Sequence, residues 1–269
     1  MRLWTTLFAL LLVFGLAFAS AATAAAPESM IAKVKKRGEL RVGFSTFVPW
    51  AMQNKNGEFV GFEIDVATRL AKDLGVQPVF YPTKWAGIIP ALLTDQFDII
   101  IAGMSVTDER KAKVDFTEAY DFAGMDMVAN KVKAAGLSTL ADFNKKEITP
   151  SARMGGSAKG AIDANLPNAT VRYFDEEAQA LQEVLSGKAH AFVSSAPLPA
   201  MQVARHPDVL FRPLQETFTK EPIGFALRKG DAESLAILNA WIAEAHANGF
   251  LKERKHYWFA TIDWEKDLK

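Results

Sequence analysis

The stretch Phe97-Asp-Ile-Ile-Ile-Ala-Gly-Met-Ser-Val-Thr-Asp-Glu-Arg110 indicates the fold most directly. Its apolar part, residues 99–102, is typical of a buried strand. Thr107 comes after a short turn and is followed by two acids. This is the pattern of a helix N-terminus, because a hydroxyl can cap the first N–H groups and acids are favoured in the first turn. The stretch therefore predicts a strand, a turn and a helix in immediate succession.

The turn in this stretch has the chemistry of an anion site. Backbone N–H groups are free at the end of the strand, Ser105 adds a hydroxyl, and Arg110 adds a guanidinium. A guanidinium can hold a carboxylate through two parallel hydrogen bonds. The alternative is that Arg110 pairs with a neighbouring acid such as Asp115, as many surface arginines do.

Strand and helix patterns alternate through the chain from residue 40 onwards, and a second unit of the same kind begins near residue 129. Strands that alternate with helices predict a largely parallel sheet covered on both faces. The predicted strands are 40–44, 79–81, 97–102, one near 148, 170–173, 191–193 and 221–228. The predicted helices are 62–74, 85–93, one ending at 166, 175–186, 231–247 and 250–259.

Composition excludes several classes of function. The 269 residues carry 31 basic and 31 acidic side chains, which argues against a nucleic-acid partner because such a partner needs a concentrated basic patch. No cysteine is present, so disulfides, thiolate metal sites and cysteine nucleophiles are excluded. The four histidines are scattered and form no zinc-binding pair, so we expect no metal and no cofactor.

The N-terminus has the pattern of a secretory signal peptide. Arg2 supplies the positive end, residues 7–18 are a continuous apolar core, and small residues at 22–26 offer cleavage sites. We predict a signal peptide over residues 1–26 and a periplasmic location. The apolar run is shorter than the roughly 20 residues of a membrane span, although a retained anchor is the alternative.

Four segments in order carry a resemblance to a known family. They are Gly61-Phe-Glu-Ile-Asp-Val-Ala67, Trp85-Ala-Gly-Ile-Ile-Pro-Ala-Leu92, Gly103-Met-Ser-Val-Thr-Asp-Glu-Arg110 and Val114-Asp-Phe-Thr-Glu-Ala-Tyr120. Together they resemble the signature of periplasmic amino-acid-binding proteins of ABC importers, the bacterial extracellular solute-binding proteins of family 3.

That resemblance implies a type II periplasmic-binding-protein fold. Each of its two lobes is a mostly parallel sheet flanked by helices, and two hinge crossovers join them. Lobe 1 would comprise residues 27–128 and 221–269, and lobe 2 residues 129–220. The resemblance also implies a monomer that captures a small amino acid or related carboxylate by hinge closure and delivers it to a membrane ABC permease.

Candidate ligand-binding residues lie just after predicted strands, where open α/β sheets bind their ligands. In lobe 1, the resemblance implies that the Gly103 carbonyl and Ser105 face the ligand's head group and that Arg110 holds its α-carboxylate. The aromatic candidates would pack on the ligand's side chain, or they are ordinary core residues. The lobe 1 candidates are Phe47, Trp50, Trp85, Gly103, Met104, Ser105 and Arg110.

In lobe 2 the segment Arg153-Met-Gly-Gly-Ser157 is predicted to be a strand-to-helix turn. Gly156 and its neighbouring glycine let the backbone approach an anion closely, and Ser157 caps the helix or binds the ligand. The family resemblance implies a carboxylate contact here. Arg153 points into the cleft or is solvated; the sequence leaves both open.

One position departs from the family pattern. The family usually has an aspartate after the strand at 191–193, where it pairs with the ligand's α-ammonium, but this chain has Ser195. A hydroxyl supplies no negative charge, and removing an ammonium from water without a counter-ion costs on the order of several kcal/mol. We hypothesise that the ligand is an atypical acid that lacks a free primary α-amine or carries it differently.

The enzymatic alternative also comes from a resemblance. Cyclohexadienyl dehydratases share the fold, and the segment 241–251 is similar to theirs. Their chemistry needs a general acid in the cleft, whereas the segment 194–201 contains no carboxylate. The sequence therefore favours a binding protein with no catalytic residue.

Overall fold

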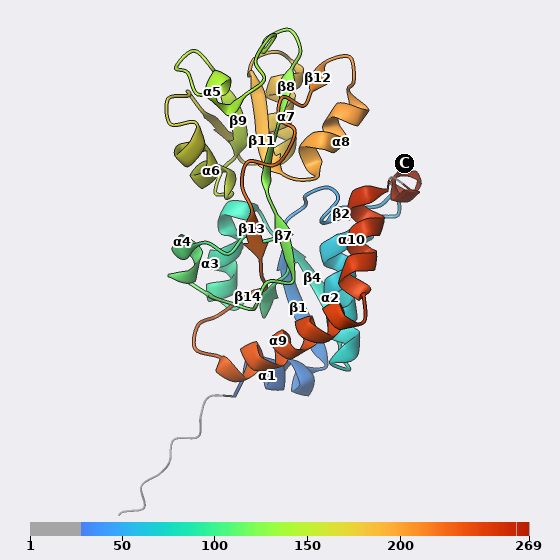
Figure 1. The fold of residues 1–269 in the computed structure, drawn as a ribbon. Helices are drawn as coiled ribbons and strands as arrows, with labels where there is room; N and C mark the ends of the chain where they lie inside the picture. Colours follow the sequence, from blue (N-terminus) through green and yellow to red (C-terminus); the bar gives the residue numbers. More distant parts are fainter. Residues whose placement is uncertain (1–27, 262, 269) are drawn as a thin grey trace, which may run out of the picture.

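The computed structural model describes residues 28–261 and 263–268, which form two lobes, each built on a five-stranded mixed sheet (Figure 1). The predicted signal peptide lies outside the described residues. The first sheet has the order β4-β1-β5-β14-β6, and the second has the order β10-β9-β11-β8-β12. In each sheet the three strands at one side run parallel and the remaining pairings are antiparallel.

The strands of the first sheet are β1 (Glu39–Phe44), β4 (Gln77–Pro82), β5 (Ile99–Ile100), β6 (Asp115–Phe116) and β14 (Ala226–Leu227). The strands of the second are β8 (Met125–Asn130), β9 (Pro150–Arg153), β10 (Arg172–Phe174), β11 (Ala191–Ser195) and β12 (Leu210–Phe211). A separate hairpin joins β2 (Met52–Gln53) to β3 (Phe59–Val60).

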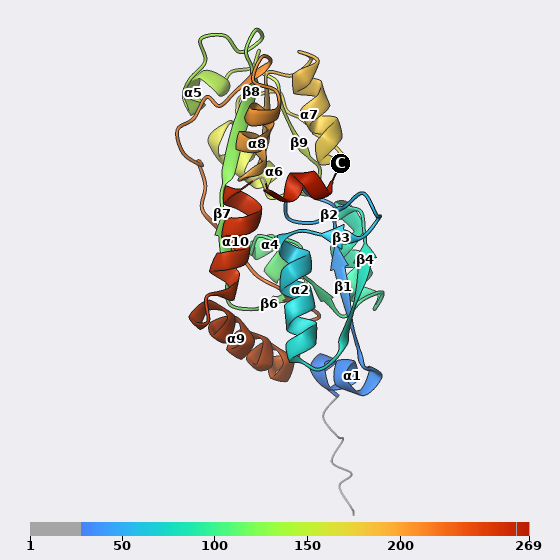
Figure 2. The same ribbon diagram turned by 90° about the vertical axis from the view of Figure 1, so that its right-hand side faces the viewer.

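The helices cover these sheets, and the C-terminal helices return to the first lobe, where α10 packs on both α2 and α9 (Figure 2). In the described residues, no helix is both long enough and apolar enough to cross a membrane. The first lobe has α1 (Met30–Arg37), α2 (Phe62–Asp73), η1 (Trp85–Gly87), α3 (Ile88–Leu93), α4 (Asp108–Lys111), α9 (Ala232–Ala247), α10 (Phe250–Ala260) and η2 (Asp263–Asp267). The second has α5 (Leu140–Phe143), α6 (Ala158–Asn165), α7 (Glu177–Leu185) and α8 (Leu198–Arg205).

Two antiparallel strands, β7 (Asp121–Ala123) and β13 (Glu221–Ile223), run between the lobes. The predicted boundary between residues 128 and 129 falls inside β8, which pairs with β11 in the second sheet. We therefore propose that the first crossing lies in β7. We likewise propose that the second crossing lies in β13, which begins at the predicted boundary 220/221.

Most predicted elements are present, with altered ends. The predicted strand at 97–102 is reduced to β5, although backbone bonds from Asp98 and Ile101 to β1 continue the pairing on either side. The strand near 148 begins at residue 150. The strand predicted over 221–228 is divided at Gly224, where an added Cβ would lie 3.2 Å from the Thr117 carbonyl oxygen.

A buried carboxyl group connects the first lobe to the crossing strand. Glu63, in the first turn of α2, is fully buried, and the Tyr120 hydroxyl donates to its two oxygens at 2.8 and 2.7 Å. The backbone N–H of Gly103 adds a hydrogen bond. Burial nevertheless raises the pKa of Glu63 to about 8, and nearby Asp121 adds to the rise.

We expect Glu63 to make stability fall as the pH rises. Between pH 4.5 and about 8 the carboxyl is protonated in the folded protein but ionised in the unfolded chain, so the free energy of unfolding decreases through this window. Glu63→Gln keeps an acceptor for Tyr120 and should flatten that decrease, measured by urea unfolding at pH 5, 6.5 and 8. Glu233→Gln, at an exposed residue, is the control; equal slopes in all three proteins would contradict the assignment.

Candidate functional site

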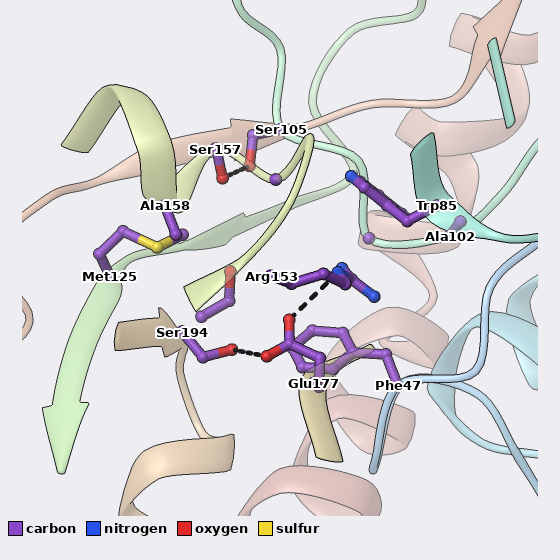
Figure 3. Close-up of a pocket in the computed structure, with 13 residues that line it drawn as sticks. Phe47, Trp85, Ala102, Ser105, Met125, Arg153, Ser157, Ala158, Glu177 and Ser194 are labelled. Atoms are coloured by element: carbon purple, nitrogen blue, oxygen red, sulfur yellow. Dashed lines mark hydrogen bonds and ion pairs between the residues drawn. The ribbon is translucent and has the colours of Figure 1, made fainter. Parts of the chain in front are cut away.

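A narrow cavity lies between the lobes, at the carboxyl ends of β1, β5, β9 and β11 (Figure 3). This is the crevice where open α/β sheets bind ligands. The predicted residues that line it are Phe47, Trp85, Gly103, Ser105, Arg153, Gly156, Ser157 and Ser195. The lining residues that the sequence analysis missed are Ala102, Met125, Ala158, Glu177 and Ser194.

The two lobes touch directly around this cavity. The indole N–H of Trp85 donates to the Gly155 carbonyl oxygen at 3.0 Å, and the Ser105 and Ser157 hydroxyl oxygens are 3.2 Å apart. Trp85 and Ser105 belong to the first lobe, and their partners precede or open α6 in the second. The structure therefore has the lobes closed on each other, with polar groups from both facing the same space.

Arg110 is held at the edge of this space by the helix that the sequence predicted. Thr107 caps α4 by accepting from the Arg110 backbone N–H. Arg110 is only 8% exposed; its guanidinium donates to the Ser105 carbonyl oxygen at 2.7 Å and to the Gly155 carbonyl oxygen at 3.3 Å. It also lies over the Trp85 ring, 5.5 Å from the centroid.

No carboxylate among the described residues forms an ion pair with Arg110. The alternative pairing with Asp115 is wrong, because Asp115 accepts the Gly230 N–H instead. Burial lowers the pKa of Arg110 to about 10, so the group remains charged at neutral pH. Arg110 lines an outer cavity that adjoins the inner one and shares Trp85, Gly156 and Ser157 with it.

Arg153 points into the inner cavity, which decides the orientation that the sequence left open. Its Nε lies 3.3 Å from Glu177 Oε1, and the other Glu177 oxygen accepts from the Ser194 hydroxyl at 3.1 Å (Figure 3). Burial raises the pKa of Glu177, opposed by the charge of Arg153, and burial lowers the pKa of Arg153. The pair places one positive and one negative charge inside the cleft.

Besides Arg110, which lines the outer cavity, two further predicted site residues do not line the inner cavity. Trp50 is 1% exposed and packs on Phe259 of α10, with ring centroids 4.6 Å apart. Its ring also lies beneath Gly103, where an added Cβ would approach within 2.8 Å. Met104 is buried in the apolar cluster around Trp85 and lines only the outer cavity. Both side chains therefore support the site from the core.

The bacterial extracellular solute-binding protein family 3 model matches residues 40–261. The chain belongs to this family. The L-cystine-binding protein TcyJ of Escherichia coli K12 is 30% identical over 237 residues, which are 88% of each chain. Cyclohexadienyl dehydratase of Pseudomonas aeruginosa is 26% identical over 90% of this chain and 91% of that enzyme.

A solved structure agrees with this family assignment. The crystal structure of the ancestral amino-acid-binding protein AncCDT-1, a precursor of cyclohexadienyl dehydratase, superposes with a TM-score of 0.78 at 40% identity. The match covers 86% of this chain and 99% of that protein. The type II two-lobe fold expected from the sequence is confirmed, and so is membership of a family of amino-acid-type binding proteins.

Within this family 3 protein, Glu177 is the most informative residue that sequence reasoning missed. It opens α7 directly after β10 and therefore lies at the carboxyl edge of the sheet. Open α/β sheets bind their ligands at this edge, so the position of Glu177 in the predicted order of elements could have identified it. Residues 194–201 contain no carboxylate, but Glu177 supplies a carboxyl group to the cleft from another element.

Proposed function

We propose that this family 3 protein is the periplasmic solute-binding component of an ABC importer, with a small amino acid or related carboxylate as its ligand. The observation that carries the proposal is Arg110, a guanidinium buried between the lobes with no carboxylate partner among the described residues. A buried charge needs an opposite charge or full hydrogen bonding. The ligand's α-carboxylate would supply both.

Closure of the lobes follows from this arrangement. Arg110 and Ser105 come from the first lobe, and Gly156 and Ser157 come from the second. A ligand that touches all four favours the closed state, because only that state makes every contact. The carboxylate would replace the long Arg110 bond to the Gly155 carbonyl, and β7 and β13 would absorb the motion.

The signal peptide and the periplasmic location remain expectations from the sequence and the family. The same applies to the monomeric state and to the membrane permease as partner. Export to the periplasm would be needed for an importer of this kind, since the binding protein must meet the permease outside the inner membrane.

The ligand is proposed to differ from an ordinary amino acid in its α-amine, which is either absent or bound differently. Ser195 lines the cavity at the position where the family usually has aspartate, and Glu177 is already paired with Arg153 and Ser194. No free negative charge is left for an α-ammonium at that position. The ligand therefore lacks a free primary α-amine, or its amine competes for Glu177.

Replacing Arg110 tests the carboxylate contact. A thermal-shift panel of monocarboxylates, dicarboxylates, betaines, sulfonates and standard L-amino acids first identifies binders by mass action. Arg110→Ala should then weaken binding of the best acid by about 10- to 100-fold, because charged hydrogen bonds contribute roughly 1.5–3 kcal/mol. Titration calorimetry measures the affinity, and Arg69→Ala, which removes a surface ion pair with Asp73, is the control. Unchanged affinity in Arg110→Ala would refute the contact.

Restoring the usual acid tests the amine hypothesis. Ser195→Asp should increase the affinity for ordinary L-amino acids by about tenfold or more, since it gives the ammonium a counter-ion within the cleft. Ser195→Asn has similar size without the charge and should leave that affinity unchanged. Micromolar binding of standard L-amino acids by the unsubstituted protein, with the same affinity in Glu177→Gln, would contradict the hypothesis.

A second candidate function is a dehydratase of the cyclohexadienyl type. One specific observation favours it: Glu177 is a buried carboxyl with a raised pKa that lines the cleft, as a general acid would. Under the main proposal, the purified protein does not consume prephenate or arogenate in a spectrophotometric assay. Turnover that disappears in Glu177→Gln would instead identify an enzyme.

A further inference from the structure

We propose that Arg153 holds a second anionic group of the ligand, so that the preferred ligand is a small acid with two anionic groups. The proposal rests on the proposed function, because it assumes that the ligand's first carboxylate binds Arg110. It adds a specificity-determining residue and a narrower ligand class. Two sources share this chemistry, a free dicarboxylate and an acidic amino acid.

Arg153 lies in the cleft, where it would contact a ligand, rather than on the protein surface. It ends β9 in the second lobe and is 6% exposed. Its guanidinium carbon lies 4.4 Å from the Trp85 ring centroid and 5.2 Å from that of Phe47, both in the first lobe (Figure 3). The side chain therefore crosses the space between the lobes and lies between two aromatic rings.

The hydrogen bonding of Arg153 is incomplete. Its Nε and Nη1 are buried and have no hydrogen-bond partner in the described part of the chain. Glu177 offsets the charge at 3.3 Å from Nε, but its other oxygen is used by Ser194. The aromatic rings stabilise the cation without accepting hydrogen bonds in the plane of the guanidinium. An acceptor from a ligand would complete the site.

The two cations of the cleft agree with a ligand that has two anionic groups. Arg110 and Arg153 are both positive, and Glu177 supplies one negative charge beside Arg153. A monocarboxylate at Arg110 leaves the Arg153 donors unsatisfied, whereas a ligand with two anionic groups gives each guanidinium an acceptor. If the ligand also has an ammonium, Glu177 is the carboxylate that can receive it.

The occupied aromatic space also disfavours one class of ligand. A ligand with a cationic side chain would have to share the space between Phe47 and Trp85 with the Arg153 guanidinium. Like charges at this distance in a buried site repel strongly. L-arginine and L-lysine are therefore expected to bind more weakly than acids of similar length.

Calorimetric titration with matched ligands tests the proposal. Glutarate is compared with butyrate, and L-glutamate with L-glutamine, on the unsubstituted protein and on Arg153→Gln. The diacid of each binding pair should bind at least about tenfold more tightly than its partner, and Arg153→Gln should remove that preference. Arg172→Gln, at an exposed lobe 2 arginine paired with Glu183, is the matched control and should retain the preference.

The outcomes separate the two proposals. If monoacids and diacids bind equally well and Arg110→Ala still weakens both, the role of Arg153 is refuted and the proposed function stands. If no acid binds, or Arg110→Ala has no effect, the proposed function fails and this inference fails with it. The preference of the unsubstituted protein is measured without any variant, so misfolding of Arg153→Gln leaves a decisive comparison.

The two sources are separated by the same titrations. Binding of glutarate without L-glutamate supports the dicarboxylate form of the proposal, with no amine in the ligand. Binding of L-glutamate supports the acidic amino-acid form, with its amine at Glu177. Glu177→Gln should then weaken binding of L-glutamate, because it removes the counter-ion of the amine.

Discussion

Burying a guanidinium costs free energy unless hydrogen bonds and opposite charge replace the water it loses. Among the described residues two arginines are buried, Arg110 and Arg153, one from each lobe, where the lobes meet. Within that part of the chain, Arg110 has carbonyl oxygens but no carboxylate, and Arg153 has a carboxylate but unpaired N–H groups. This is the basis of the proposal that an anionic ligand completes the contact between the lobes.

Trp85 lets the two cations come near each other without direct contact. Its ring lies beside both guanidinium groups, and its N–H holds the Gly155 carbonyl of the opposite lobe. The electron-rich face of an indole stabilises a cation, so one residue offsets part of both charges. In the same lobe, Glu63 is hydrogen-bonded both to the Gly103 backbone and to Tyr120, which directly precedes the crossing strand β7. The site and the crossing thus share a buried anchor in the first lobe.

The sequence predicted the order of most elements and the strand, turn and helix within residues 97–110, because those features depend on local periodicity and on capping residues. It did not predict β8, whose residues are all buried and include Asp126, an acid paired with Arg212. It misplaced Trp50, since the residue that covers its ring, Phe259, is distant in sequence. It left the orientation of the Arg153 side chain open, because the partner of that side chain, Glu177, comes from a different element. Local patterns fix elements, whereas side-chain partners depend on the tertiary fold.

Glu177 is the residue on which binding and catalysis diverge. When Glu177 is paired with Arg153, its ionised carboxylate is a counter-charge that keeps a cation in the cleft. It then carries no proton that it could donate to a substrate. If Arg153 paired with an anionic group of the ligand instead of with Glu177, the buried carboxyl would lose its counter-charge, and the pKa of Glu177 would rise further. A protonated Glu177 beside the ligand would then have the properties of a general acid. The ion pair of Arg153 and Glu177 therefore separates a binder from an enzyme more directly than the absence of an acid near Ser195 does.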